Sequence, residues 1–146
     1  MCRKLLFLCV LFLIVESAFA DNISVTIEIS GVRINGGLVY AAVYSNENDY
    51  KAEKPFAKFI LNPTNSKVSH VLELPEGEYV VSVFQDLNSN EILDENFFGI
   101  PSEPIGKTNY GLRGAPGGFN KLKTPVNKGS SKLFVNMGKV KALGVI

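Results

Sequence analysis

The fold is decided by a stretch near the start of the chain, residues 23–30, which reads Ile-Ser-Val-Thr-Ile-Glu-Ile-Ser. Apolar and polar side chains alternate through it without a break, and this period of two is typical of a β-strand with one buried face. Residues 67–74 follow the same pattern, with Val68, Leu72 and Leu74 on one side. Strands that each bury one face predict a layered β structure.

Other segments extend this interpretation. Residues 38–44 and 79–84 are apolar at nearly every position, as strands covered on both faces are. Shorter strands are predicted at 57–61, 132–137 and 140–145, and only residues 48–54 look helical. We therefore expect an all-β fold, a single antiparallel β-sandwich of about seven strands, immunoglobulin-like or transthyretin-like. One long loop, free of alternation, follows Phe84.

The first 20 residues have a different character. Two basic residues precede an apolar run over residues 5–15, and Ala18-Phe19-Ala20 has small residues at the two positions that signal peptidase reads. We expect a signal peptide over residues 1–20, cleaved after Ala20, and one domain over residues 21–146 that is exported to the periplasm or the extracellular space. The run is shorter than the roughly 20 residues that cross a bilayer, so no transmembrane span is expected in the mature chain.

Composition excludes several classes of function. Without residues 1–20 the chain keeps 13 basic and 13 acidic residues, has no cysteine, and so lacks both the basic footprint of nucleic-acid binding and any thiol chemistry. The single histidine, His70, shares a strand face with Val68 and is expected at the edge of the core. No serine has an evident His–Asp partner and no cofactor motif is present. We expect no catalytic residue and no enzyme.

The long loop opens with residues 86–96, Asp-Leu-Asn-Ser-Asn-Glu-Ile-Leu-Asp-Glu-Asn. Ca²⁺ binds six to eight oxygens, and alternate residues of a curled loop can supply them. The candidate ligands are Asp86, Asn88, Asn90, Asp94 and the main-chain carbonyl of Ile92, with Glu91, Glu95 or Glu103 as an extra ligand. The apolar Ile92 is compatible with this role, since its side chain can point to the core while its carbonyl faces the ion. The glycine and the closing glutamate of an EF-hand are absent, so binding in about the 10⁻⁴–10⁻³ M range is expected.

Two other hypotheses fit the same residues. Aspartate and asparagine also form plain turns by bonding to their own backbone. Alternatively, the carboxylates of Asp86, Glu91, Asp94, Glu95 and Glu103 include a general acid and a general base, as in a hydrolase that cleaves sugars. An apolar pocket between the sheets would make the protein a small-ligand carrier. The loop also contains five large apolar residues, most of which we expect to cap the sandwich and the rest to form an exposed patch: Phe97, Phe98, Ile100, Tyr110 and Phe119.

Several motifs occur together in one order. A strand at 37–44, Gly-Leu-Val-Tyr-Ala-Ala-Val-Tyr, approximates the pattern Gly-x-Leu-x-x-Ala-x-Tyr with Val39 at the leucine position. It precedes the run Gly-x-Tyr…Asp-x-Asn-x-Asn at 77–90, Gly-Ile-Pro-x-Glu at 99–103 and Gly-Ala-Pro-Gly-Gly-Phe at 114–119. This order resembles the bacterial exported family known as domain of unknown function 2141 (DUF2141). Residues 104–107 and 120–121 depart from the pattern of that family.

The resemblance implies a transthyretin-like or prealbumin-like sandwich in the bacterial envelope and no established activity. The expected function is thus an exported, non-enzymatic binding or structural module with a Ca²⁺-stabilised loop. Its partner would be an unidentified protein or small molecule of the envelope. A small-ligand carrier and a carboxylate-dependent envelope hydrolase are the alternatives.

Overall fold

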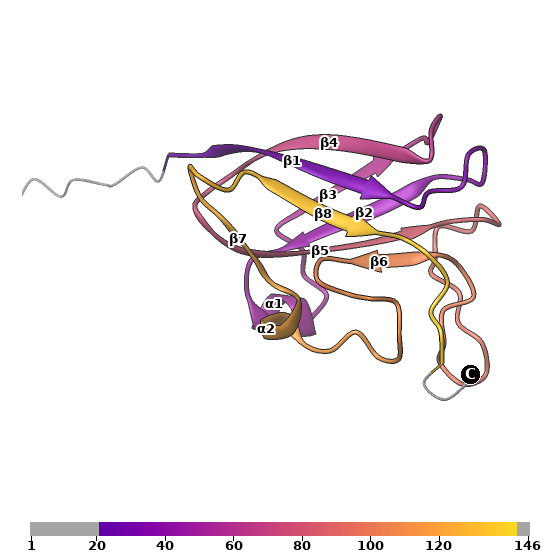
Figure 1. The fold of residues 1–146 in the computed structure, drawn as a ribbon. Helices are drawn as coiled ribbons and strands as arrows, with labels where there is room; N and C mark the ends of the chain where they lie inside the picture. Colours follow the sequence, from indigo (N-terminus) through magenta and orange to yellow (C-terminus); the bar gives the residue numbers. More distant parts are fainter. Residues whose placement is uncertain (1–20, 143–146) are drawn as a thin grey trace, which may run out of the picture.

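The chain folds into two stacked sheets (Figure 1). The computed structural model describes residues 21–142. One sheet has the order β4-β1-β8, and the other has the order β3-β2-β5-β6, with β7 paired to the beginning of β5. The strands are β1 (Ile23–Ser30), β2 (Val39–Tyr44), β3 (Ala57–Leu61), β4 (Lys67–Leu74), β5 (Gly77–Gln85), β6 (Ile105–Lys107), β7 (Thr124–Val126) and β8 (Lys132–Asn136). This arrangement confirms the all-β sandwich.

Every strand pair is antiparallel except β1 with β8, which run parallel from Thr26 beside Lys132 to Ser30 beside Asn136. Parallel neighbours cannot be joined by a tight hairpin. The chain meets this requirement because six strands separate β1 from β8 in sequence, among them β4, which pairs with the other edge of β1. The long segment after β5 leads to β6 of the same sheet, and the chain then passes through β7 to β8 in the smaller sheet.

The main core fills the space between the sheets. Alternation places Val25, Ile27 and Ile29 of β1 on its inner face, where all three are fully buried. They pack with residues of β2, β5 and β8 in one cluster that includes Val39, Val43, Val81, Leu133 and Val135. Since apolar burial is the main favourable term in folding, this cluster provides most of the stability of the sandwich.

A second apolar cluster covers the outer face of the larger sheet. Val80 of β5 points away from the main core and packs with Ile105, Tyr110, Phe119 and Leu122. The two short helices, α1 (Glu47–Lys51) and α2 (Phe119–Leu122), lie together on this side (Figure 1). Tyr110 and Phe119 thus cap the sandwich, whereas Phe97 and Phe98 are exposed and Ile100 is half-buried.

The structure also corrects some predicted boundaries. Residues 140–142 form only an isolated bridge, between Arg113 and Lys141, instead of the beginning of a strand, and residues 143–146 lie outside the described residues. The predicted signal peptide over 1–20 lies outside them too. The predicted helix over 48–54 is α1 and ends at Lys51, shortly before Glu53, which has a left-handed φ of 54°. Within residues 21–142, no helix is long and apolar enough to cross a bilayer.

Candidate functional site

Asp86 follows β5 directly and is only 2% exposed. Its Oδ1 accepts a hydrogen bond from the N–H of Asn90 (3.2 Å) and its Oδ2 accepts one from the N–H of Glu91 (2.8 Å). The N–H of Asp86 itself donates to the carbonyl of Leu38 (2.9 Å). Opposite it, Gly37 has a φ of 103°, and a Cβ there would overlap the Asp86 carbonyl oxygen. Only glycine fits this close approach, so Asp86 is tied both to β2 and to its own loop.

Glu103 is a second buried carboxylate, 4% exposed. Its Oε1 accepts from the N–H of Leu87 (2.7 Å) and its Oε2 from the N–H of Asp94 (3.3 Å). Among the described residues, no lysine or arginine nitrogen lies within 4 Å of Asp86 or Glu103. Buried charge without such bonds is costly, so these backbone donors are what keep both carboxylates in place.

The predicted ligands Asn88, Asn90 and Asp94 lie together. Nδ2 of Asn88 donates to Oδ2 of Asp94 (2.6 Å), and Nδ2 of Asn90 donates to both Asp94 oxygens (3.1 and 3.0 Å). The amide oxygens of Asn88 and Asn90 accept from the N–H groups of Asn90 and Ile92. The structure therefore brings these three side chains together, while the Asp86 oxygens face backbone N–H groups.

The Ile92 side chain does not point to the core. That side chain is 64% exposed, because the left-handed φ of Glu91 (63°) turns the chain before it reaches Ile92. Glu91 occupies the position that glycine holds in an EF-hand loop, where the same sharp turn is needed. The side chains of Glu91 and Glu95 are exposed.

These contacts define what the loop can do chemically. Within residues 21–142, no group of three or more His, Cys, Asp or Glu side chains is arranged to hold a metal ion. The available donor set is two carboxylates, two amides and one carbonyl, and the amides would have to rotate to present their oxygens. To act as a general acid, Asp86 or Glu103 would have to be protonated. The neutral group would accept its two N–H hydrogen bonds less strongly, and the loop would be destabilised.

Residues 94–102 form a small hairpin that projects from this loop. The Ser102 N–H donates to the Asp94 carbonyl (2.8 Å). The Asn96 N–H donates to the Ile100 carbonyl, and the Asn96 carbonyl accepts from the Gly99 N–H (2.9 Å each). Oδ1 of Asn96 also accepts from the N–H groups of Phe98 and Ile100. At the tip, Phe97 is 98% exposed and Phe98 80% exposed, with their rings edge to face at 5.6 Å. We call this segment the aromatic hairpin.

Two hollows of about 540 and 570 Å³ lie on the outer side of the larger sheet and share Glu53 and Leu93. The stacked rings of Tyr40 and Phe84 line the first hollow. The second is bounded by the aromatic hairpin and residues 110–116. Lys107 borders the second hollow. Its ammonium donates to the Tyr50 hydroxyl (3.0 Å), and burial lowers the pKa of Lys107, an effect that Glu53 partly opposes. A carrier would therefore use these outer hollows, because core side chains occupy the space between the sheets.

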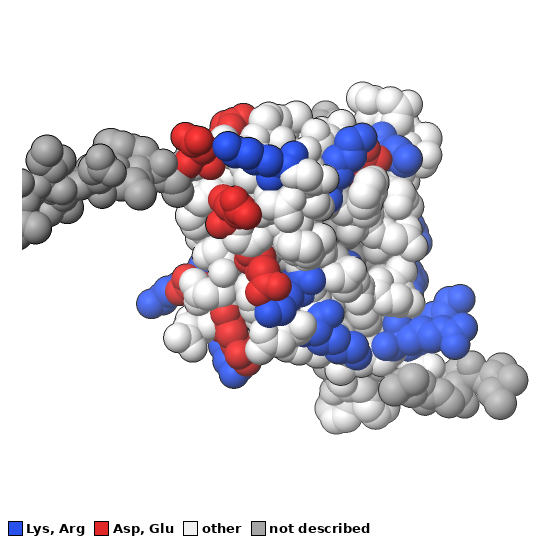
Figure 2. Space-filling model, turned by 60° about the vertical axis from the view of Figure 1, so that its left-hand side comes forward, with Lys and Arg blue, Asp and Glu red and all other residues white. Residues whose placement is uncertain are grey.

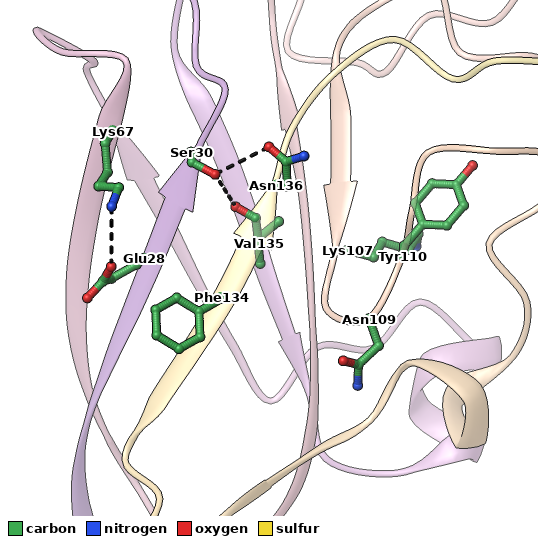
Figure 3. A pocket seen from close by; sticks show the side chains of 9 residues that line it. All are labelled: Glu28, Ser30, Lys67, Lys107, Asn109, Tyr110, Phe134, Val135 and Asn136. Atoms are coloured by element: carbon green, nitrogen blue, oxygen red, sulfur yellow. Dashed lines mark hydrogen bonds and ion pairs between the residues drawn. The ribbon is translucent and has the colours of Figure 1, made fainter.

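A third hollow, of about 330 Å³, lies beside β1 and β8 (Figure 3). Glu28 and Lys67 point toward each other there (3.8 Å), and Glu28 also pairs with Lys132 (3.5 Å). The Ser30 hydroxyl donates to the Asn136 side chain in the same place. Because Glu28 already pairs with two lysines and Lys107 donates to Tyr50, this hollow is a weaker candidate site than the outer pair.

Comparison with known proteins gives a single finding. The model of a family described as "uncharacterized protein conserved in bacteria (DUF2141)" matches residues 27–133, from β1 into β8. This match confirms the resemblance inferred from the motifs. No curated protein and no solved structure matches the chain significantly.

The role of Glu103 can be tested with a matched pair of variants. Glu103→Gln replaces one carboxylate oxygen with an amide NH₂ group, so that a donor faces a backbone N–H donor. We expect it to lower the free energy of unfolding by about 1–3 kcal/mol in urea denaturation. Glu95→Gln changes an exposed carboxylate on the same loop and should leave stability unchanged. Equal stability of the two variants would contradict a bracing role for Glu103.

Proposed function

The chain belongs to the DUF2141 family of uncharacterised bacterial proteins, and from this premise we propose that it is an exported, non-enzymatic binding module. One observation carries the proposal: Phe97 and Phe98 are largely exposed on a hairpin that several backbone and Asn96 hydrogen bonds hold in shape. Exposed aromatic pairs of this kind are a known mark of contact surfaces.

The bracing has a consequence for binding. A loop that is ordered only on contact has to lose its conformational freedom at that moment, which weakens the complex. Here the carboxylates of Asp86 and Glu103 and the Asn96 side chain order the connection beforehand. The aromatic hairpin is then a pre-organised contact surface and the sandwich is its support.

This proposal predicts that the two rings are unimportant for folding. The double variant Phe97→Ser with Phe98→Ser should keep the thermal midpoint of the unaltered chain, because two largely exposed rings bury little area in the folded state. Phe119→Ser is the buried control and should lose about 3–5 kcal/mol. If the double variant unfolds many degrees earlier, the rings are structural and the proposal fails.

We also propose the loop from Asp86 to Asp94 as a weak Ca²⁺ site. The support is its donor chemistry, namely Asp86, Asn88, Asn90, Asp94 and the Ile92 carbonyl, and the convergence of the two amides on Asp94. Bound Ca²⁺ would replace the amide donors at Asp94 and further stiffen the base of the aromatic hairpin.

A Ca²⁺ titration tests this site. With a dissociation constant of about 10⁻⁴–10⁻³ M, about 10 mM Ca²⁺ should stabilise the fold by about 1.4–2.7 kcal/mol, and EDTA should reverse the effect. Mg²⁺ at the same concentration and the Asp94→Asn variant are the controls. A melting temperature that about 10 mM Ca²⁺ leaves unmoved would exclude the site.

The second candidate function is a small-ligand carrier, and the specific observation that favours it is the pair of hollows joined at Glu53 and Leu93. A carrier purified gently from its host should retain a ligand that native mass spectrometry detects. Leu93→Trp, which would obstruct both hollows, should abolish the added mass. A protein that carries no ligand from its host would favour the binding module.

A further inference from the structure

Three basic residues lie on segments near the aromatic hairpin and have no acidic partner among residues 21–142. Arg113, Lys139 and Lys141 are exposed, and none of them forms an ion pair with a described acidic residue. Arg113 and Lys141 are neighbours in a parallel bridge, where the Gly114 N–H donates to the Lys141 carbonyl (3.0 Å). Blue side chains gather at the end of the molecule where the described chain stops (Figure 2). We call these three residues the basic rim.

The segments that carry the basic rim border the same hollow as the aromatic hairpin, through residues next to the three cations. Phe98, Gly99 and Ile100 line it from the hairpin, and Gly114, Val140 and Ala142 line it from the bridged segments. Lys139 and Lys141 flank Val140 in sequence and are exposed, whereas Val140 is half-buried. In Figure 1 the connection after β5 likewise descends to the end of the molecule where the described chain stops. Cationic and aromatic side chains therefore share one end of the domain.

We propose that this end of the domain docks on a phospholipid bilayer with anionic headgroups. Phe97 and Phe98 would enter the boundary between headgroups and acyl chains, and Arg113, Lys139 and Lys141 would lie against the lipid phosphates. Apolar side chains beside lysine and arginine are the combination that binds such interfaces. The inference rests on the proposed binding module and names its partner.

A bilayer fits this surface better than a folded protein does. A stable protein interface buries about 800 Å² on each partner, over a patch that is broad and complementary in shape. The aromatic hairpin instead presents two neighbouring rings at a projecting tip, with the cations set to one side. A fluid bilayer accommodates a projecting tip, since lipids move aside and aromatic rings settle at the interface.

Two acidic residues also border the hollow, and removing a negative charge there tests whether electrostatic attraction drives docking. Glu53 partly opposes the lowering of the Lys107 pKa that burial causes, whereas Glu95 lies on the aromatic hairpin itself. Anionic lipid should repel the carboxylate of Glu95. Glu95→Gln should therefore strengthen docking, although it removes a charged group from the contact surface.

The experiment uses fluorescence, because the chain has no tryptophan. Phe97→Trp places a single reporter at the tip, and Phe134→Trp places one at an exposed position of β8 as the matched control. Each variant is titrated with vesicles of phosphatidylglycerol mixed with phosphatidylcholine, and with vesicles of phosphatidylcholine alone. We expect a blue shift of the emission only for Phe97→Trp and only with the anionic vesicles.

Further variants separate the two components of docking, with vesicle co-sedimentation as the measurement. Replacing both phenylalanines by serine should weaken partitioning at least about tenfold. Replacing Lys139 and Lys141 by glutamine should weaken it about fivefold for each charge and reduce its sensitivity to salt.

Three results would overturn the proposal. The first is the absence of binding to anionic vesicles, the second is equal binding to neutral vesicles, and the third is a blue shift of Phe97→Trp that depends on protein concentration without lipid, which would indicate self-association. In each case the binding module itself stands as long as the double serine variant is fully stable. If that variant is unstable, the module fails together with the membrane contact.

Discussion

Asp86 and Glu103 are buried carboxylates that accept hydrogen bonds from backbone N–H groups and have no basic partner among the described side chains. Ionised carboxylates are among the strongest acceptors, and each one here receives two N–H groups. A neutral side chain of the same shape would satisfy these donors only in part. The two charges thus fix where the chain leaves β5 and where it returns before β6, and the hairpin and hollows between these points depend on them.

The sandwich and the connection after β5 rest on different physical terms. Apolar side chains between the sheets stabilise the sandwich, and their contribution is not directional. The connection has few buried apolar side chains before Ile105, so directional bonds have to order it. This division allows the hairpin to carry exposed rings, because its shape does not require their burial. The sandwich then acts as a rigid base for a surface with its own chemistry.

The sequence predicts the sandwich well, because β1 and β4 alternate over eight residues and β5 is apolar on both faces. β6, β7 and α2 have only three or four residues each and show no period to detect. In the site, spacing predicts a curled loop from Asp86 to Asp94, but it does not specify which way the oxygens turn. The sequence also does not show that Phe97 is exposed and Phe119 buried, since tertiary packing alone decides which ring is buried. The basic rim is signalled only by the short alternation of Lys139, Val140 and Lys141.

Native-state amide hydrogen exchange measures this bracing directly, because it reports on the individual N–H groups that the carboxylates hold. If the carboxylates brace the connection, the N–H groups of Leu87 and Glu91, although they lie in an exposed loop, exchange far more slowly than that of Ser89. Asp86→Asn should then remove the protection at Glu91 while the amides of β1 stay protected. Exchange at Leu87 and Glu91 as fast as in an unfolded chain would contradict the bracing of the connection by buried carboxylates.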